Sequence, residues 1–116
     1  MTPFIYLLLG HLVGDYLIQT SWMAENKARH WGALLLHCTL YTLAVAVAAL
    51  WGGVTLPLWS FGLLFLSHVV LDRRTFVVWW NRVIMGNTTQ NWLFIMTDQI
   101  FHILVLALLL HYFGVN

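Results

Sequence analysis

Residues 92–113 read WLFIMTDQIFHILVLALLLHYF, an almost unbroken apolar run whose one acid is Asp98. A membrane-spanning helix needs about 20 mostly apolar residues, or about 17 at the short end, and this run is long enough. Three further stretches have the same character, namely residues 3–20, 33–51 and 57–72. The sequence therefore predicts an all-α, polytopic membrane protein. Residues 1–116 would form a single transmembrane domain, with four transmembrane helices in a compact bundle.

The composition favours the same class of protein. Of the 116 residues, 61% are hydrophobic and 8% are charged, whereas soluble domains carry about 25% charged residues. So few charges cannot cover the surface of a small soluble protein. They also exclude a disordered chain and a nucleic-acid binder, and they leave membrane lipids as the expected partners. The single cysteine, Cys38, excludes an internal disulfide.

The basic residues predict how the bundle is oriented. All five Lys and Arg residues lie in two linkers, residues 21–32 and 73–91. In a four-span chain these linkers share one face. The excess of positive charge in cytoplasmic loops predicts that this face is cytoplasmic, with both termini outside.

The second basic linker has a helical pattern of its own. Apolar residues recur there at helical spacing, and they are Phe76, Val77, Trp80, Val83 and Ile84. The pattern predicts a short interfacial helix near residues 74–85, with Asn81 and Arg82 on its polar side.

Three of the four acids have a histidine four positions away, which places both side chains on one face of a helix. The pairs are His11 with Asp15, His68 with Asp72, and His102 with Asp98. For six histidines in this chain, each acid has about a one in ten chance of such a neighbour. Three matches among four acids therefore indicate a functional arrangement.

The predicted topology places these pairs, together with His37, in the layer of the membrane nearest the cytoplasm. A buried carboxylate costs several kcal/mol, and three in one place also repel one another. A divalent cation offsets both costs, and imidazole and carboxylate are ligands for zinc, iron and manganese, with zinc favoured here. We expect one or two metal ions held by ligands from this set: His11, Asp15, His37, His68, Asp72, Asp98 and His102.

Two glutamines and two glycines further support a polar site in this layer of the membrane. Gln19 and Gln99 lie at the same depth and are expected to orient the metal ligands. Gly10 and Gly14 form a small-xxx-small pair, which would let the first span approach a neighbouring helix closely beside the site.

The halves of the spans away from the cytoplasm carry almost no polar side chains, so the polar layer ends inside the bundle. A transport path would continue across the bilayer. We therefore expect hydrolysis of a lipid-like or amphipathic substrate by metal-activated water, with Trp79 and Trp80 beside the entrance. Asp72, nearest the interface, is the expected proton carrier, and Asp15 is the second candidate catalytic carboxylate.

Two other functions stay open on the sequence alone. A homo-oligomer could line a path at its interface, which would make the protein a divalent-metal or proton transporter. Alternatively, the polar residues could fix helix register in a non-enzymatic membrane interaction protein, with Asp72 paired to the adjacent Arg73 and Arg74.

The block His11-Leu-Val-Gly-Asp15-Tyr-Leu-Ile-Gln19, followed by Asn26-Lys27, resembles a bacterial and phage family of small integral membrane proteins of unknown function. The other marks of the resemblance are His37, His68 with Asp72-Arg73, and Asp98-Gln99 with His102. The resemblance spans nearly the whole chain and implies a location in the bacterial inner (cytoplasmic) membrane. The pattern is also similar in style to membrane proteins described as metal-dependent hydrolases, which is an analogy of pattern only.

Overall fold

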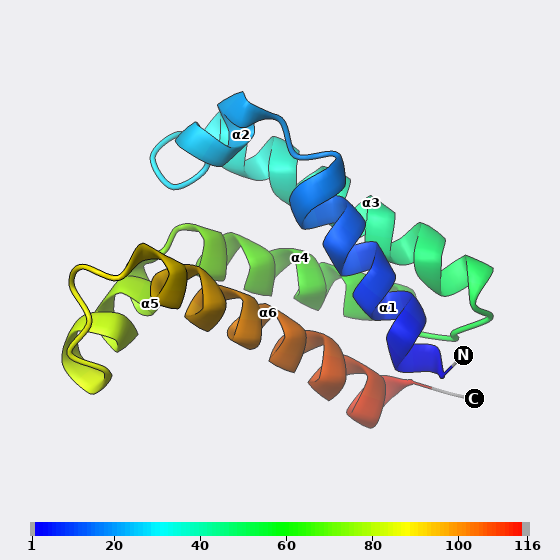
Figure 1. The fold of residues 1–116 in the computed structure, drawn as a ribbon. Coiled ribbons are helices and arrows are strands. Elements are labelled where there is room, and N and C mark those ends of the chain that lie inside the picture. Colours follow the sequence, from blue (N-terminus) through cyan, green and yellow to red (C-terminus); the bar gives the residue numbers. More distant parts are fainter. Residues whose placement is uncertain (1, 115–116) are drawn as a thin grey trace.

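The computed structural model describes residues 2–114, and all regular structure in them is helical (Figure 1). Two of the elements, η1 and η2, are single π-helical turns that continue an α-helix. In chain order the elements are α1 (Pro3–Leu12), η1 (Val13–Leu17), α2 (Ser21–Asn26), α3 (Trp31–Trp51), α4 (Leu58–Asp72), α5 (Thr75–Trp79), η2 (Trp80–Ile84) and α6 (Asn91–Phe113).

Four of these helices form the bundle. Helix α1 packs against α3 and α6, and α4 packs against the same two helices from the other side. Both chain ends lie at one end of the bundle, whereas α2 and α5 lie at the opposite end (Figure 1). The radius of gyration of 14.2 Å confirms the prediction of a compact all-α bundle.

The prediction of four membrane-spanning helices is wrong in number, because two helices are long and apolar enough to cross a membrane. These are α3, with 21 residues, and α6, with 23. The other two apolar helices, Pro3–Leu17 and Leu58–Asp72, are shorter. The 15 residues of α4 reach about 22 Å at 1.5 Å per residue, less than the hydrocarbon core of about 30 Å.

Local backbone features mark the ends of these two shorter helices. The first helix ends at Leu17, and Thr20 then caps α2 by accepting a hydrogen bond from the Met23 amide at 3.2 Å. Helix α4 ends where Arg74 takes a left-handed conformation with φ of 69°, which an α-helix cannot contain. The end of α4 agrees with the predicted end of the stretch 57–72, whereas the first helix ends three residues before the predicted end of the stretch 3–20.

Helix α1 approaches α3 closely at two glycines, as the small-xxx-small pattern predicts. A Cβ on Gly10 would lie 2.8 Å from the Cα of Val45, and one on Gly14 would lie 3.0 Å from the Cα of Tyr41. Any larger residue would push the two backbones apart. This close contact holds Asp15, in the next turn, against the interior of the bundle.

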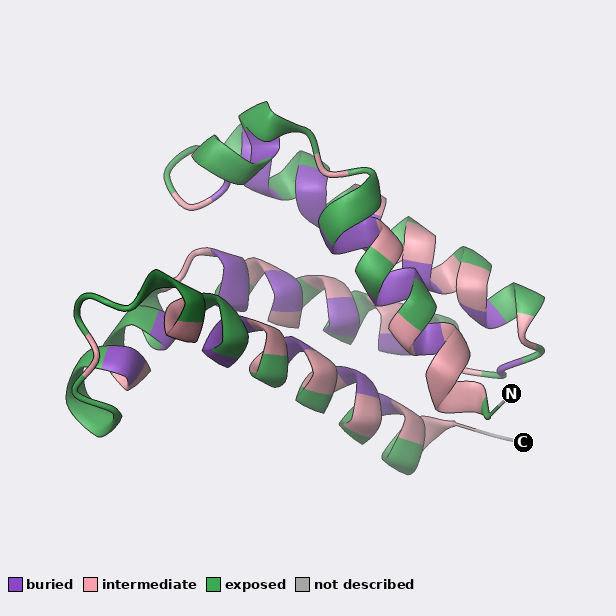
Figure 2. Cartoon of the chain, viewed as in Figure 1, coloured by how far each residue is buried: buried purple, intermediate pink, exposed green. Residues whose placement is uncertain are grey.

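The interior differs between the two ends of the bundle. Toward the chain termini it is an apolar core, which includes Leu7, Val45, Leu64 and Leu106. Toward α2 and α5 it is polar and contains the histidines and aspartates. The outward faces of the helices are largely exposed (Figure 2), and many of the side chains there are apolar, with Leu58 88% exposed.

Helix α5 and η2 occupy the place of the predicted interfacial helix, but their buried face is not the predicted one. Val77 and Asn81 face inward with 0% and 2% exposure, whereas Val83 and Ile84 are exposed. Asn81 tolerates burial because its side-chain amide donates to the Val77 carbonyl at 3.0 Å and its Oδ1 accepts from Asn87 at 2.9 Å. The outward face of this segment therefore carries exposed apolar side chains together with the exposed Arg82.

Candidate metal centre

The structure brings the seven predicted ligands together at the polar end of the bundle. They come from all four bundle helices, and every one is buried, with Asp98 the most exposed at 8%. The contributing elements are α1 with η1 (His11, Asp15), α3 (His37), α4 (His68, Asp72) and α6 (Asp98, His102).

Four side chains form the inner group of donor atoms. The Nε2 atoms of His37 and His68 lie 2.9 Å apart. The Oδ2 of Asp72 lies 3.0 Å from each of these nitrogens. The Oδ1 of Asp15 lies 3.2 Å from His37 Nε2 and 3.4 Å from His68 Nε2. One atom from each residue therefore lies within 4.8 Å of all the others.

This inner group fits a tetrahedral metal ion. Ligands about 2.0–2.2 Å from zinc stand about 3.3–3.6 Å apart at the corners of a tetrahedron, close to the observed separations of 2.9–3.4 Å. Within residues 2–114, Asp15 Oδ1 and Asp72 Oδ2 are buried without a well-formed hydrogen bond. Two nitrogens and two carboxylate oxygens that converge at these distances are a ligand set that suits a divalent cation.

Asp72, Asp98 and His102 form an outer group. The Nδ1 of His102 donates to the Asp98 backbone carbonyl at 2.7 Å, which leaves the lone pair on Nε2 when the ring is neutral. That Nε2 lies 3.0 Å from Asp72 Oδ1. A backbone carbonyl that fixes the tautomer of a histidine is typical of metal ligands.

Asp72 belongs to both groups. Its Oδ2 faces the nitrogens of His37 and His68, and its Oδ1 faces His102. At 1% exposure it is the most central carboxylate of the centre. The arrangement is that of a carboxylate that joins two neighbouring binding positions.

His11 lies beside these groups with both ring nitrogens already hydrogen bonded. Its Nδ1 lies 2.8 Å from the Tyr41 hydroxyl, and its Nε2 lies 2.7 Å from Gln99 Oε1. Tyr41 also stacks on His68, with ring centroids 3.8 Å apart. The structure therefore places His11 where it positions neighbours, rather than among the converging donor atoms.

The two predicted orienting glutamines differ in their contacts. Gln99 donates to Asp15 Oδ2 at 3.2 Å while its oxygen faces His11, so it links α6 to the first helix. Gln19 instead donates to the backbone carbonyl of Asp15 at 2.8 Å and closes the end of its own helix. Only the Gln99 contacts reach side chains of the centre.

Comparison with known proteins decides the family. Residues 3–116 match the family described as "Protein of unknown function (DUF3307)". The chain belongs to the DUF3307 family. Neither a curated protein nor a solved structure matches it. The family description gives no activity, so what this DUF3307 centre can do is argued from its residues.

Lys27 is a residue of the DUF3307 centre that the pattern of acids and histidines did not reveal. It follows α2, is 6% exposed, and places its Nζ 3.1 Å from Asp72 Oδ2. The available sequence signal was its position beside Asn26 in the family-like block, but nothing there indicated burial. A lysine in a linker normally extends into solvent.

If the histidines are neutral, the buried charges of the centre do not balance. The centre holds three carboxylates, those of Asp15, Asp72 and Asp98, and one ammonium group, that of Lys27, which contacts Asp72. With neutral histidines, three negative charges against one positive charge leave a net charge of −2. Among residues 2–114, Arg73 forms no salt bridge with these carboxylates, and its guanidinium lies 4.3 Å above the ring of Trp31.

The predicted one-turn pairs explain only part of the observed contacts. His68 contacts Asp72 directly at 3.0 Å. The closest side-chain approaches in the other two pairs are 3.8 Å for His11–Asp15 and 3.7 Å for His102–Asp98. The nearest partners of the aspartates come mostly from other helices, which sequence spacing cannot show.

Proposed function

We propose that this protein lies in a membrane and binds a divalent metal ion, with zinc favoured, at the His/Asp centre. We further propose that it uses this centre to hydrolyse a lipid-like or amphipathic substrate. The observation that carries the proposal is the inner group of Asp15, His37, His68 and Asp72, whose buried donor atoms lie within 4.8 Å of one another.

The distribution of polarity supports a location in the membrane. The buried interior holds aspartates, histidines and a lysine, while large apolar side chains cover the outside. Leu17, Leu50 and Leu58 are 78–88% exposed. This is the reverse of a soluble protein, and it suits a bundle whose outer surface contacts lipid tails. Helices α3 and α6 would cross the bilayer, with α1 and α4 packed between them.

The basic residues support an orientation. The Lys and Arg residues precede α3 or lie between α4 and α6, at the end of the bundle away from both termini (Figure 1). The positive-inside rule favours a cytoplasmic position for this end. The centre would then lie near the cytoplasmic surface of the inner membrane, with both termini outside.

A bound divalent ion would supply a Lewis acid that polarises a carbonyl or phosphoryl group of the substrate. His37, His68, Asp15 and Asp72 would hold the ion, and His102 would extend the binding site from Asp72. Lys27 places a fixed positive charge beside Asp72, where it can stabilise an anionic group of the substrate.

The contacts revise which carboxylate carries the proton. The sequence favoured Asp72, but that side chain is 1% exposed and contacts nitrogens with both oxygens. The Asp98 side chain is 12% exposed, and its Oδ1 has no well-formed hydrogen bond among residues 2–114. We therefore assign proton transfer to Asp98 and metal binding to Asp72 and Asp15.

The two alternative functions, a transporter and an interaction protein, require different structural features. A monomeric transporter needs a polar path through the whole bundle, yet the half nearest the termini is filled by an apolar core that includes Leu7, Val45 and Leu106. An interaction protein needs no ion at all, because its polar cluster would only fix the helix register. Metal content and turnover separate these possibilities.

The deciding experiment measures metal in detergent-purified protein by mass spectrometry. We expect about one zinc ion per chain for the tetrahedral inner group and its loss in His68→Gln. His111→Gln is the matched control, since His111 is exposed near the other end of α6 and should keep full occupancy. A folded wild-type chain without stoichiometric metal would contradict both the metal site and the hydrolase.

A second measurement tests the reaction. Metal-loaded protein in nanodiscs is incubated with phospholipids and other amphipathic esters, and product release is followed for the wild type and Asp98→Asn. We expect turnover to fall by about a hundredfold or more in the variant while metal content stays. Metal uptake into proteoliposomes that depends on Asp15, without hydrolysis, would favour the transporter instead.

A further inference from the structure

A groove with three arginines lies where α4 passes into α5 and η2. Arg73, Arg74 and Arg82 line it together with Trp79 and Val83, around a volume of about 440 Å³. The left-handed conformation of Arg74 turns the chain sharply after α4, so that residues of this turn, of α5 and of η2 line one groove. The groove takes no part in the proposed metal centre.

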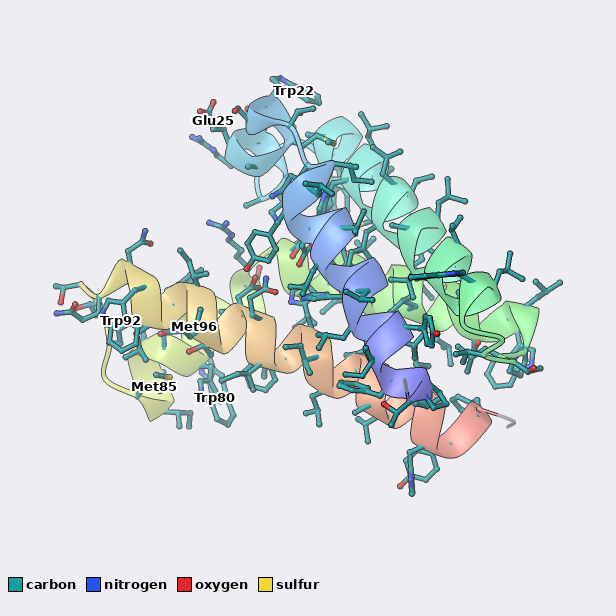
Figure 3. The ribbon with its side chains drawn as sticks, turned by 45° about the vertical axis from the view of Figure 1, so that its right-hand side comes forward. Trp22, Glu25, Trp80, Met85, Trp92 and Met96 are labelled. Carbon is teal, nitrogen blue, oxygen red and sulfur yellow. The ribbon has the colours of Figure 1, made fainter. Side chains whose placement is uncertain are left out.

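The positive charge of this groove has no protein counter-ion. Within residues 2–114, none of its arginines forms a salt bridge, because the aspartates lie inside the bundle and Glu25 lies on α2. Figure 3 shows Glu25 and Trp22 projecting from α2 away from the rest of the molecule. Two of the guanidinium groups rest on aromatic rings, with Arg74 5.6 Å from Phe94.

The groove also has an apolar margin. Trp79, Val83 and Ile84 are 48–63% exposed on the same helical segment. Figure 3 places Trp80 and Trp92 at this end of the bundle as well. Basic and apolar surfaces thus lie side by side, as at the level of the headgroups in a membrane.

We propose that this groove binds the phosphate headgroup of an anionic phospholipid. Guanidinium groups match the geometry of phosphate oxygens, and several of them compensate its charge. The exposed Trp79 and Val83 would contact the glycerol backbone and the first methylenes of the same lipid. The apolar margin favours a lipid over free phosphate. The proposal rests on the membrane location proposed above, but it does not depend on the metal or on hydrolysis.

The test measures lipid binding to the full-length, metal-loaded protein in detergent by native mass spectrometry. The probes are phosphatidylglycerol, phosphatidylcholine with the same acyl chains, and inorganic phosphate. We expect tight binding of one phosphatidylglycerol and weak binding of phosphatidylcholine. Each arginine near a membrane surface contributes a few-fold in affinity, so Arg82→Gln should weaken phosphatidylglycerol binding by about fivefold. Arg74→Gln with Arg82→Gln should weaken it by about twenty-five-fold if the two arginines act independently.

Arg29→Gln is the matched control, because Arg29 is an exposed arginine at the same end of the molecule but outside the groove. Equal weakening in this variant would mean general surface charge and would overturn the proposal. Displacement of the lipid by inorganic phosphate alone would assign the groove to free phosphate. Arg82 is exposed, so folding should survive its replacement, and unchanged metal content verifies this. If the groove variants lose lipid while metal is absent from all forms, the metal centre fails and the lipid site stands.

Discussion

At the scale of single residues, Asp72 is the centre of the site. It contacts His37, His68, His102 and Lys27 within 3.0–3.1 Å, which joins three helices and a linker. In a low-dielectric interior, a charged group keeps its charge only when partners replace the lost hydration. Lys27 supplies one such partner permanently, and we infer that a divalent metal ion supplies the rest.

This compensation of charge by Lys27 and a metal ion predicts how Lys27→Met changes the stability of the protein. Loss of the ammonium group changes the net charge of the metal-free centre from −2 to −3, so the metal-free protein should lose about 3 kcal/mol of stability. The metal-loaded protein should lose less, because the ion compensates part of the charge. The measurement is chemical unfolding with and without zinc. Arg29→Met, at an exposed position in the same linker, should change neither form.

An equal loss of stability with and without zinc would show that the charge of Lys27 is not coupled to metal binding. It would leave the lysine as a structural counter-ion of Asp72 alone. That result would favour the interaction protein over the metal-dependent hydrolase.

At the scale of elements, two features determine where the first helix places Asp15. They are the close contact of this helix with α3 and its final π-helical turn. Gly10 and Gly14 allow the two backbones to come close, and Tyr41 fills the remaining space beside Gly14. The turn Val13–Leu17 closes with a hydrogen bond from the Ile18 amide to the Val13 carbonyl at 3.0 Å. Turns of this kind are frequent at functional sites, and this one carries Asp15 into the centre.

Gly14→Ala tests this contact. The new Cβ would lie 2.9 Å from the Tyr41 ring and 3.0 Å from its Cα, so α1 must move away from α3. We expect a loss of about 1–3 kcal/mol in unfolding free energy and a weaker zinc affinity, because the His11–Tyr41 contact of 2.8 Å moves with the helix. Unfolding and zinc titration measure the two effects.

Gly62→Ala is the control for this substitution. Gly62 lies in α4, and nothing is within 4 Å of a Cβ placed there. In a helix interior alanine is favoured over glycine by up to about 1 kcal/mol, so this variant should be as stable as the wild type or more stable. If both variants behave alike, the close packing of α1 on α3 does not control the site.

At the scale of the whole molecule, the protein has a polar interior at one end, an apolar core at the other and an apolar exterior. The two helices that are long enough to cross a membrane are α3 and α6. The two shorter apolar helices, α1 and α4, each pack against both of them. The centre lies at the end with the basic linkers, so in the proposed membrane location the orientation would decide from which compartment a substrate reaches it.

Single-cysteine labelling tests the orientation. The native Cys38 is 0% exposed and should not react, so the unmodified chain serves as the background. Thr55→Cys lies between α3 and α4, and Thr88→Cys lies between η2 and α6, both at exposed positions. In intact bacteria with a permeable outer membrane, an impermeant maleimide should label the first by at least about tenfold more than the second.

Labelling of Thr88→Cys in intact cells would reverse the proposed orientation. Equal labelling of both positions only after the membrane is solubilised would show that neither connection faces outward. Either result would contradict a centre that opens to the cytoplasm with both termini outside.

The sequence singled out seven polar residues that the structure brings together at one end of the bundle. An aspartate inside an apolar helix is costly to bury, so its presence in such a stretch is informative by itself, and the histidines one turn away strengthened the signal. The prediction worked because side-chain spacing on a helix follows from local geometry. The sequence pattern did not reveal Lys27 and Tyr41, because these residue types are common in linkers and helices. Their roles depend on contacts between elements.

By itself, the sequence determined the all-α class, the apolar helices, the glycine contact and the set of candidate ligands. These follow from hydrophobicity and helical periodicity, which are local properties of the chain. Only the tertiary structure showed the π-helical turn that ends the first helix at Leu17 and the left-handed Arg74 that turns the chain after α4, and it leaves α3 and α6 as the two helices long enough to cross a membrane. It also decided that Asp72 joins two groups and that His11 lies beside them, because those contacts come from packing between helices.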